Sequence, residues 1–173
     1  MRLGRHMPLN SKPLKAIEIA QQLGCNAIQI FASNPTGWRP TAGNPEACVA
    51  FAQAAQRCGL DPIVIHAPYL INLASPDDVI WEKSIALLRW TMQRGALLGA
   101  TYVVFHTGSH RGSGVEAGIA RIAQAIARIL PETPEAGRPQ GVPLHLRNVG
   151  APLAGALLPS LLLENDVGAG NAL

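Results

Sequence analysis

Helical patterns and short buried strands alternate along this chain of 173 residues, with a repeat of about 35–40 residues. The apolar runs at 27–31, 63–66 and 101–105 have the length and composition of buried strands. A helical segment separates each of these runs from the next. Consecutive strands are therefore expected to pair in parallel through helical crossovers. The alternation predicts an α/β fold built on one parallel sheet.

Proline, acidic residues and glycine mark the ends of the expected helices. Proline stands near the start of the first two helices, and Asp77 and Asp78 lie at the positive end of the third helix dipole. Gly24 and Gly59 stand where the first two helices stop. The patterns predict helices at about 13–24, 45–57, 76–98 and 114–130.

A parallel sheet of this kind forms either a barrel or a doubly wound open sheet. No G-x-G-x-x-G motif follows the first strand and no G-x-x-x-x-G-K-[ST] motif occurs, so the phosphate cradles of the common open-sheet folds are missing. A TIM-type (β/α) barrel is therefore favoured. A complete barrel needs about 250 residues. We expect one domain over residues 1–173 that forms the N-terminal part of a barrel, with about five strands and four helices.

The composition says more about the cellular location of the protein than about its binding partners. The formal net charge is +3, but the 14 basic residues are spread along the chain and do not by themselves indicate nucleic acid. The three cysteines, Cys25, Cys48 and Cys58, lack C-x-x-C spacing and are typical of reduced thiols in a cytoplasmic protein. No stretch approaches the ~18 apolar residues of a membrane span, so no membrane partner is expected.

His66 and His106 each close an apolar strand and precede a turn. Parallel strands lie about 4.8 Å apart, so imidazoles at the carboxyl ends of consecutive strands can reach a shared metal ion or metal pair. The alternative is that each is an ordinary half-buried histidine bonded to the backbone. Two histidines in matching places favour metal ligands and an enzyme.

Other residues belong to the same end of the predicted sheet. His110 is a candidate ligand, outer donor or phosphate contact, or else an exposed loop histidine. His6 follows the strand-like start at 2–5. It either borders the same site or belongs to a poorly ordered N-terminus. Tyr69 and Trp38 lie in loops where an aromatic ring can stack on a base or sugar, or pack beneath the loop.

Two motifs carry a resemblance to a known family. Residues 65–73 read I-H-A-P-Y-L-I-N-L, and residues 105–110 read F-H-T-G-S-H. In this order and at this distance they resemble the endonuclease IV family of apurinic/apyrimidinic endonucleases. G-R-H at 4–6 and F-A-S-N at 31–34 are similar to further family segments, so the resemblance covers residues 1–131.

The resemblance implies a TIM barrel with three zinc ions that acts in DNA repair. It implies hydrolysis of the phosphodiester on the 5′ side of an abasic site in double-stranded DNA, leaving a 3′-hydroxyl. His66 and His106 match zinc ligands, and Asn34 and Tyr69 match positions in loops that contact the damaged DNA. His6 and His110 are then candidates for groups just outside the ligands.

The chain departs from the family pattern in two places. The first DNA loop has Pro35-Thr36-Gly37 where the family often has a long basic or polar side chain. The fifth strand should carry a glutamate that bridges metals. Residues 144–151 have the expected position but place Arg147 there, and a cation cannot bind zinc; residues 161–171 offer Glu164 instead. We expect Glu164 to be the catalytic metal ligand and 131–160 to be irregular or inserted.

Three interpretations remain open. The first is a repair endonuclease that binds fewer zinc ions than the full family site, because no residues follow to supply the later ligands. The second is a metal-dependent sugar isomerase or epimerase of the related barrel superfamily, which the H-T-G-S-H turn and the Tyr69 loop disfavour. The third is a noncatalytic truncated barrel that self-associates through open sheet edges at 2–5 or 161–164.

Overall fold

The structure is a computed structural model and describes residues 1–8, 13–40, 43–130 and 145–148. Strands and helices alternate throughout these residues, as the sequence predicts. Their order is β1 (Gly4–Met7), α1 (Pro13–Gln22), β2 (Ala27–Phe31), α2 (Pro45–Arg57), β3 (Ile63–His66), α3 (Asp78–Leu97), β4 (Tyr102–Phe105), α4 (Val115–Ile129) and β5 (His145–Asn148).

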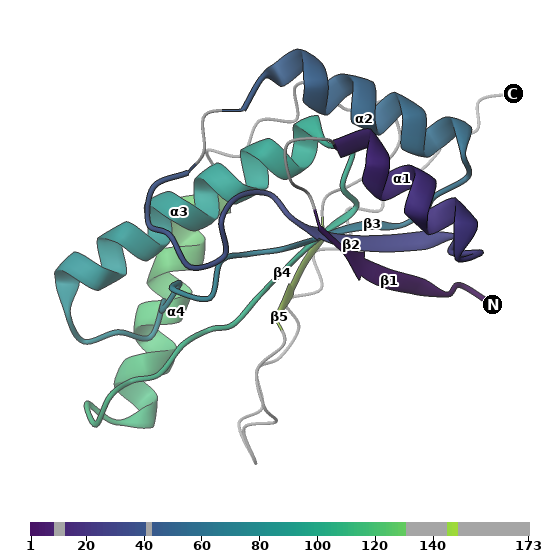
Figure 1. Cartoon of the computed structure of the whole chain (residues 1–173). Helices are drawn as coiled ribbons and strands as arrows, with labels where there is room; N and C mark the ends of the chain where they lie inside the picture. The colour runs from purple at the N-terminus through teal and green to yellow at the C-terminus, as the bar shows by residue number, and fades with distance from the viewer. Residues whose placement is uncertain (9–12, 41–42, 131–144, 149–173) are drawn as a thin grey trace, which may run out of the picture.

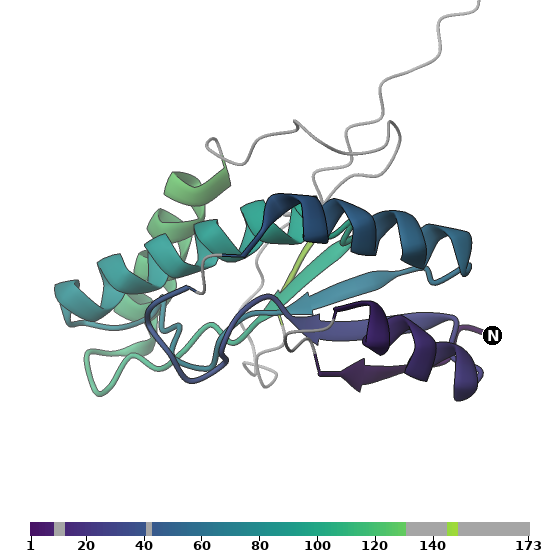
Figure 2. The same ribbon diagram turned by 45° about the horizontal axis from the view of Figure 1, so that its top comes forward.

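The five strands form one sheet in the order β1-β2-β3-β4-β5, and every neighbouring pair is parallel. The helices lie along one side of the sheet (Figures 1 and 2). Helix α1 contacts α2, α2 contacts α3, and α3 contacts α4. A curved parallel sheet with its helices outside is the front part of a TIM barrel. The predicted incomplete (β/α) barrel is confirmed.

The core lies between the sheet and these helices. Along β2 and β3 every second residue is buried, and the residues between are half-buried on the opposite face. Ile30 and Ile65 from the sheet and Phe51 and Leu88 from the helices are fully buried. His66 alternates with Ile65 and therefore lies on the face away from the helices, which is the inside of a barrel.

The first strand begins later than the sequence indicates. We expected it at 2–5, but the structure has Gly4–Met7, with Gly4 paired to Ala27 and Met7 to Ile30. Burial and pairing explain the shift, since Met7 is only 1% exposed and a Cβ on Gly4 would lie 2.5 Å from the Ala27 carbonyl oxygen. His6 is consequently within the strand and not after it.

The fifth strand also differs from the expectation. β5 lies inside the 131–160 range, and it is His145–Asn148, not a segment around Glu164, that pairs with β4. In this register Arg147 is opposite Val104. Strand pairing uses backbone groups, so the charge of the Arg147 side chain does not prevent this segment from pairing with β4. Glu164 and the rest of 131–160 lie outside the described residues.

Two broader expectations can be compared with the structure. Cys25, Cys48 and Cys58 are all free thiols. Among the helices of the described residues, none combines the length and apolar character needed to cross a membrane.

Candidate metal centre

β3 and β4 bring His66 and His106 together at their carboxyl ends. His66 is the last residue of β3 and pairs with Val104, while His106 directly follows β4. The centroids of the two imidazole rings are 5.3 Å apart. The pairing predicted from the sequence is thus present in the fold. Two imidazoles at this separation are close enough to bind one metal ion or two adjacent ions.

The hydrogen bond of His66 leaves one ring nitrogen free for a metal. Its Nδ1 lies 2.7 Å from the carbonyl oxygen of Ala67. A carbonyl oxygen only accepts, so Nδ1 carries the proton and Nε2 carries the lone pair. Metal-binding histidines typically have this arrangement, in which the outer ring nitrogen donates to a carbonyl or carboxylate. The donor set at His66 therefore fits zinc.

Aromatic rings surround the two histidines. The ring of Phe31 is 5.2 Å from that of His66, and the ring of Tyr69 is 5.4 Å from His66 and 6.1 Å from His106. Tyr69 is 56% exposed although it touches both imidazoles. It therefore presents an accessible aromatic face beside the histidine pair.

His6 lies next to the pair but uses its lone pair elsewhere. Its ring is 6.5 Å from that of His66 and 4.5 Å from that of Phe31. The Gln29 side-chain amide donates to His6 Nδ1 over 2.9 Å. Partial burial, and secondarily the nearby His66, lower the pKa of His6. A neutral His6 with an occupied Nδ1 borders the centre and does not offer Nδ1 as a ligand.

His110 stabilises its own loop. Its Nδ1 accepts hydrogen bonds from the backbone N–H groups of Gly112 and Gly114, each over 3.2 Å. Gly114 precedes the first residue of α4. The His110 lone pair is therefore used in shaping the turn before α4, and a role near the metal stays a prediction.

The loop after β2 approaches the loop after β3. Asn34 Oδ1 accepts from the Thr36 backbone N–H over 3.1 Å and from its hydroxyl over 3.0 Å, which closes a tight turn. The Tyr69 backbone N–H donates to the Pro35 carbonyl oxygen over 2.9 Å. Asn34 and Tyr69, the two expected DNA contacts, thus lie on loops joined by a hydrogen bond.

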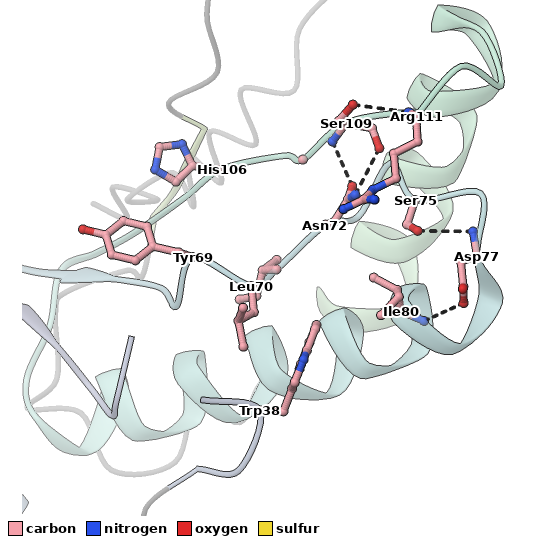
Figure 3. A pocket seen from close by; sticks show the side chains of 12 residues that line it. Trp38, Tyr69, Leu70, Asn72, Ser75, Asp77, Ile80, His106, Ser109 and Arg111 are labelled. Carbon is pink, nitrogen blue, oxygen red and sulfur yellow. Dashed lines mark hydrogen bonds between the residues drawn. The ribbon is translucent and has the colours of Figure 1, made fainter. Parts of the chain in front are cut away.

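A cavity of about 510 Å³ extends from the histidine end along these loops. Figure 3 shows Tyr69 and His106 at one end and Ser75, Asp77 and Arg111 at the other. The sequence interpretation identified Tyr69, His106 and Trp38 in this region. It did not single out the remaining lining residues as members of the site: Leu70, Ile71, Asn72, Ser75, Asp77, Ile80, Gly108, Ser109 and Arg111.

The centre is only partly formed by the described residues. Within them, no group of three or more histidine, cysteine or acidic side chains is arranged to hold a metal ion. Glu164, the expected third ligand, lies outside this part of the chain. Two imidazoles do not complete the four-ligand set typical of zinc, so a metal site at His66 and His106 would need further residues.

Comparison with known proteins places this geometry in a family. Residues 16–154 match the family model described as xylose isomerase-like TIM barrel. Among curated relatives, a probable endonuclease 4 of Natranaerobius thermophilus is 42% identical over 160 residues, which is 91% of this chain and 55% of the relative. The resemblance to the endonuclease IV family is confirmed.

Solved structures agree with this assignment. The crystal structure of endonuclease IV from Thermus thermophilus matches with a TM-score of 0.65 and 38% identity, covering 75% of this chain and 47% of that one. A structure of L-ribulose 3-epimerase matches with a TM-score of 0.61 at 18% identity, over 84% of this chain and 48% of that one, and shows the fold alone. This chain spans about half the length of the curated relatives it matches.

Proposed function

This chain belongs to the xylose isomerase-like TIM barrel family, and we propose that it is the N-terminal part of a zinc-dependent endonuclease that incises DNA at abasic sites. The observation that carries the proposal is the His66–His106 pair, with ring centroids 5.3 Å apart at adjacent strand ends. The curated relative at 42% identity is named a probable endonuclease 4, which supports a nuclease over other enzymes of this fold.

We assign zinc binding to three residues of this chain. His66 would bind through Nε2, because its Nδ1 is held by the Ala67 carbonyl oxygen. His106 would bind from the neighbouring strand end, and Glu164 would supply a carboxylate. When bound, zinc supplies hydroxide near neutral pH and stabilises charge on a phosphate and on its leaving oxygen.

The surrounding residues would hold the DNA. The exposed ring of Tyr69 offers a stacking surface for a sugar or base next to the histidines. Asn34 and Trp38 come from the adjoining loop, and Trp38 lines the same cavity as Tyr69 and His106. These contacts would place the phosphodiester on the 5′ side of an abasic site beside the metal ligands. The products would be a 3′-hydroxyl and a 5′-phosphate, with no covalent bond to the protein.

Location and assembly are further parts of this proposal. Three free cysteines support a reducing compartment such as the cytoplasm. β1 and β5 stand at the two ends of the described strand order and could pair with another copy of the chain. Sedimentation of the purified chain at several concentrations tests this self-association. The likeness to sugar epimerases is one of fold alone, at 18% identity, and does not support that activity.

The test uses the full chain and a duplex with a single synthetic abasic site. We expect bound zinc and incision on the 5′ side of that site that a chelator abolishes. His66→Asn should weaken zinc binding by more than the roughly 10–100-fold that loss of an outer-shell partner costs. His110→Asn is the matched control and should keep zinc, because the His110 lone pair is occupied within its own loop.

The outcomes separate the interpretations. Absence of bound zinc would contradict the metal centre. Zinc binding without incision would favour the truncated, noncatalytic barrel. Incision that resists chelation would show that the histidine pair is not the reactive centre.

A further inference from the structure

Asn72 belongs to the loop after β3, lines the cavity, and is hydrogen-bonded to the loop after β4 (Figure 3). We propose that Asn72 is a positioning residue whose side-chain amide locks the loop after β4 onto the loop after β3 and so holds His106 beside His66. The effect of this loop contact on zinc affinity rests on the proposed function. The geometry itself can be tested without metal.

The side-chain amide of Asn72 makes two hydrogen bonds to the backbone of Ser109. Asn72 Nδ2 donates to the Ser109 carbonyl oxygen over 3.0 Å, and the Ser109 N–H donates to Asn72 Oδ1 over 2.9 Å (Figure 3). At neutral pH, the side-chain amides of Asn and Gln are the groups that offer a donor and an acceptor side by side in this way. The amide thus replaces a neighbouring strand and continues the β3–β4 contact beyond the ends of both strands.

The backbone of Asn72 is fixed to α3. Its N–H donates to Ser84 Oγ over 2.9 Å, and Ser84 Oγ donates to the Ile80 carbonyl oxygen over 2.7 Å. Ser84 is fully buried, and the flanking Ile71 and Leu73 are 2% and 0% exposed. The amide is therefore presented by a part of the loop that packs rigidly against the helix.

Gly108 is what allows the turn after His106 to close over the amide. Its φ is +94°, and a Cβ placed there would lie 2.0 Å from Asn72 Oδ1 and 2.5 Å from Asn72 Cγ. No side chain other than hydrogen fits this approach. Gly108 and Ser109 follow His106 after a single threonine, so the contact constrains the backbone just beyond the proposed metal ligand.

A second contact joins the loops without the amide. The Ala74 N–H lies 3.2 Å from both the Thr107 carbonyl oxygen and Asn72 Oδ1. The backbone bond to Thr107 would remain if the amide were lost. Removal of the amide is therefore expected to loosen the position of His106 without unfolding the barrel.

The decisive variant is Asn72→Asp in the full chain. It keeps the size of the side chain but removes the donor and sets a carboxylate oxygen against the Ser109 carbonyl. Asn26→Asp is the matched control. The amide of Asn26 also pairs with backbone, accepting from the Leu3 N–H over 2.7 Å and donating to the Met1 carbonyl over 3.2 Å, before β2 at the opposite end of the sheet.

Two readouts report position and not stability alone. In the metal-free protein, we expect a nuclear Overhauser contact between the His66 and His106 rings in the wild type and in N26D, and its loss in N72D. In a zinc titration against a chromophoric chelator, we expect N72D to bind about 10–100-fold more weakly and N26D to bind as the wild type does.

The results distinguish this inference from the proposed function. If the wild type binds no zinc, the proposed metal centre fails, but the ring contact still decides the role of Asn72. A ring contact that persists in N72D overturns the inference, as does an equal loss of zinc affinity in N72D and N26D. If N72D does not fold, Asn72→Ala, which removes the amide without adding charge, takes its place with the same expected losses.

Discussion

Two contacts join the β3–α3 unit to the β4–α4 unit, and they use different chemistry. One lies between the loops after β3 and β4, and the other lies between the outer helices α3 and α4. The loops are joined by the neutral amide of Asn72, bonded twice to the backbone of Ser109. The helices are joined by Trp81, whose ring lies 4.5 Å from the Arg121 guanidinium and 5.1 Å from that of Arg128. One contact fixes a backbone, and the other buries a large side chain.

This difference separates position from stability. Trp81 is only 8% exposed and removes much apolar surface from water, which is the main source of folding free energy. The amide of Asn72 buries little surface, and its hydrogen bonds replace bonds to water. Changes at the helix contact should therefore lower the free energy of unfolding, and changes at the loop contact should mainly move the histidines.

The largest expected effect is that of Trp81→Ala. Loss of this side chain should lower the free energy of unfolding by about 3–5 kcal/mol, measured by urea denaturation. It also removes the bond from Trp81 Nε1 to the Arg121 carbonyl oxygen, 3.3 Å long. In the protein that remains folded, the His66–His106 ring contact should persist.

Trp90→Ala provides the control for this prediction. Trp90 lies on the same helix and also faces a guanidinium, that of Arg94 at 5.6 Å, but it is only partly buried. Its loss should cost less. Equal destabilisation by the two variants would contradict the importance of the α3–α4 contact.

A smaller loss in the free energy of unfolding is expected for Gly108→Ala, which disrupts the contact between the loops after β3 and β4. The left-handed backbone at this position should cost a non-glycine residue about 1–3 kcal/mol, and the new Cβ would also displace the Asn72 amide. Gly112→Ala is a close control, because φ there is +90° but a Cβ would meet nothing within 4 Å. Both variants carry backbone strain.

Only Gly108→Ala should separate the His66 and His106 rings. The nuclear Overhauser contact between them is the measurement, with urea denaturation giving the common cost of backbone strain. Loss of the ring contact in both variants would mean that the loop conformation, and not Asn72, holds His106.

The sequence predicted the helices and most strands because their signals are local. The strands at 27–31 and 63–66 have the expected bounds, and the first two helices end before Gly24 and Gly59, whose φ angles are +68° and +66°. Glycine at such a position is a helix-ending signal that a single sequence carries. The pairing of His66 with His106 followed from parallel strand order and also needed no further information.

The loop contact and the outer strands could not be predicted in the same way. Asn72 and Ser109 are 37 residues apart, and nothing in either segment indicates the other as its partner. β1 is defined by its pairing with β2 and β5 by its pairing with β4, so both depend on tertiary contacts. The lone pair of His110 is likewise used by amides that its own turn brings close.

The smallest effect is expected at the exposed edge of the α3–α4 contact, where Arg128 forms a two-bond ion pair with Glu82 at 2.7 and 2.9 Å. The hydrogen bond from Arg128 lowers the pKa of Glu82 below its ordinary value of 4.5. Because the folded pKa is below the unfolded one, the stabilisation is present above the unfolded pKa and is lost as the pH falls through the folded pKa.

Glu82→Gln should therefore slightly lower the melting temperature at pH 7, and less so in high salt. The difference from the wild type should vanish well below pH 4.5. A difference that persists in acid would show that Glu82 acts through packing, and would place this pair with Trp81 instead of with the weak surface charges.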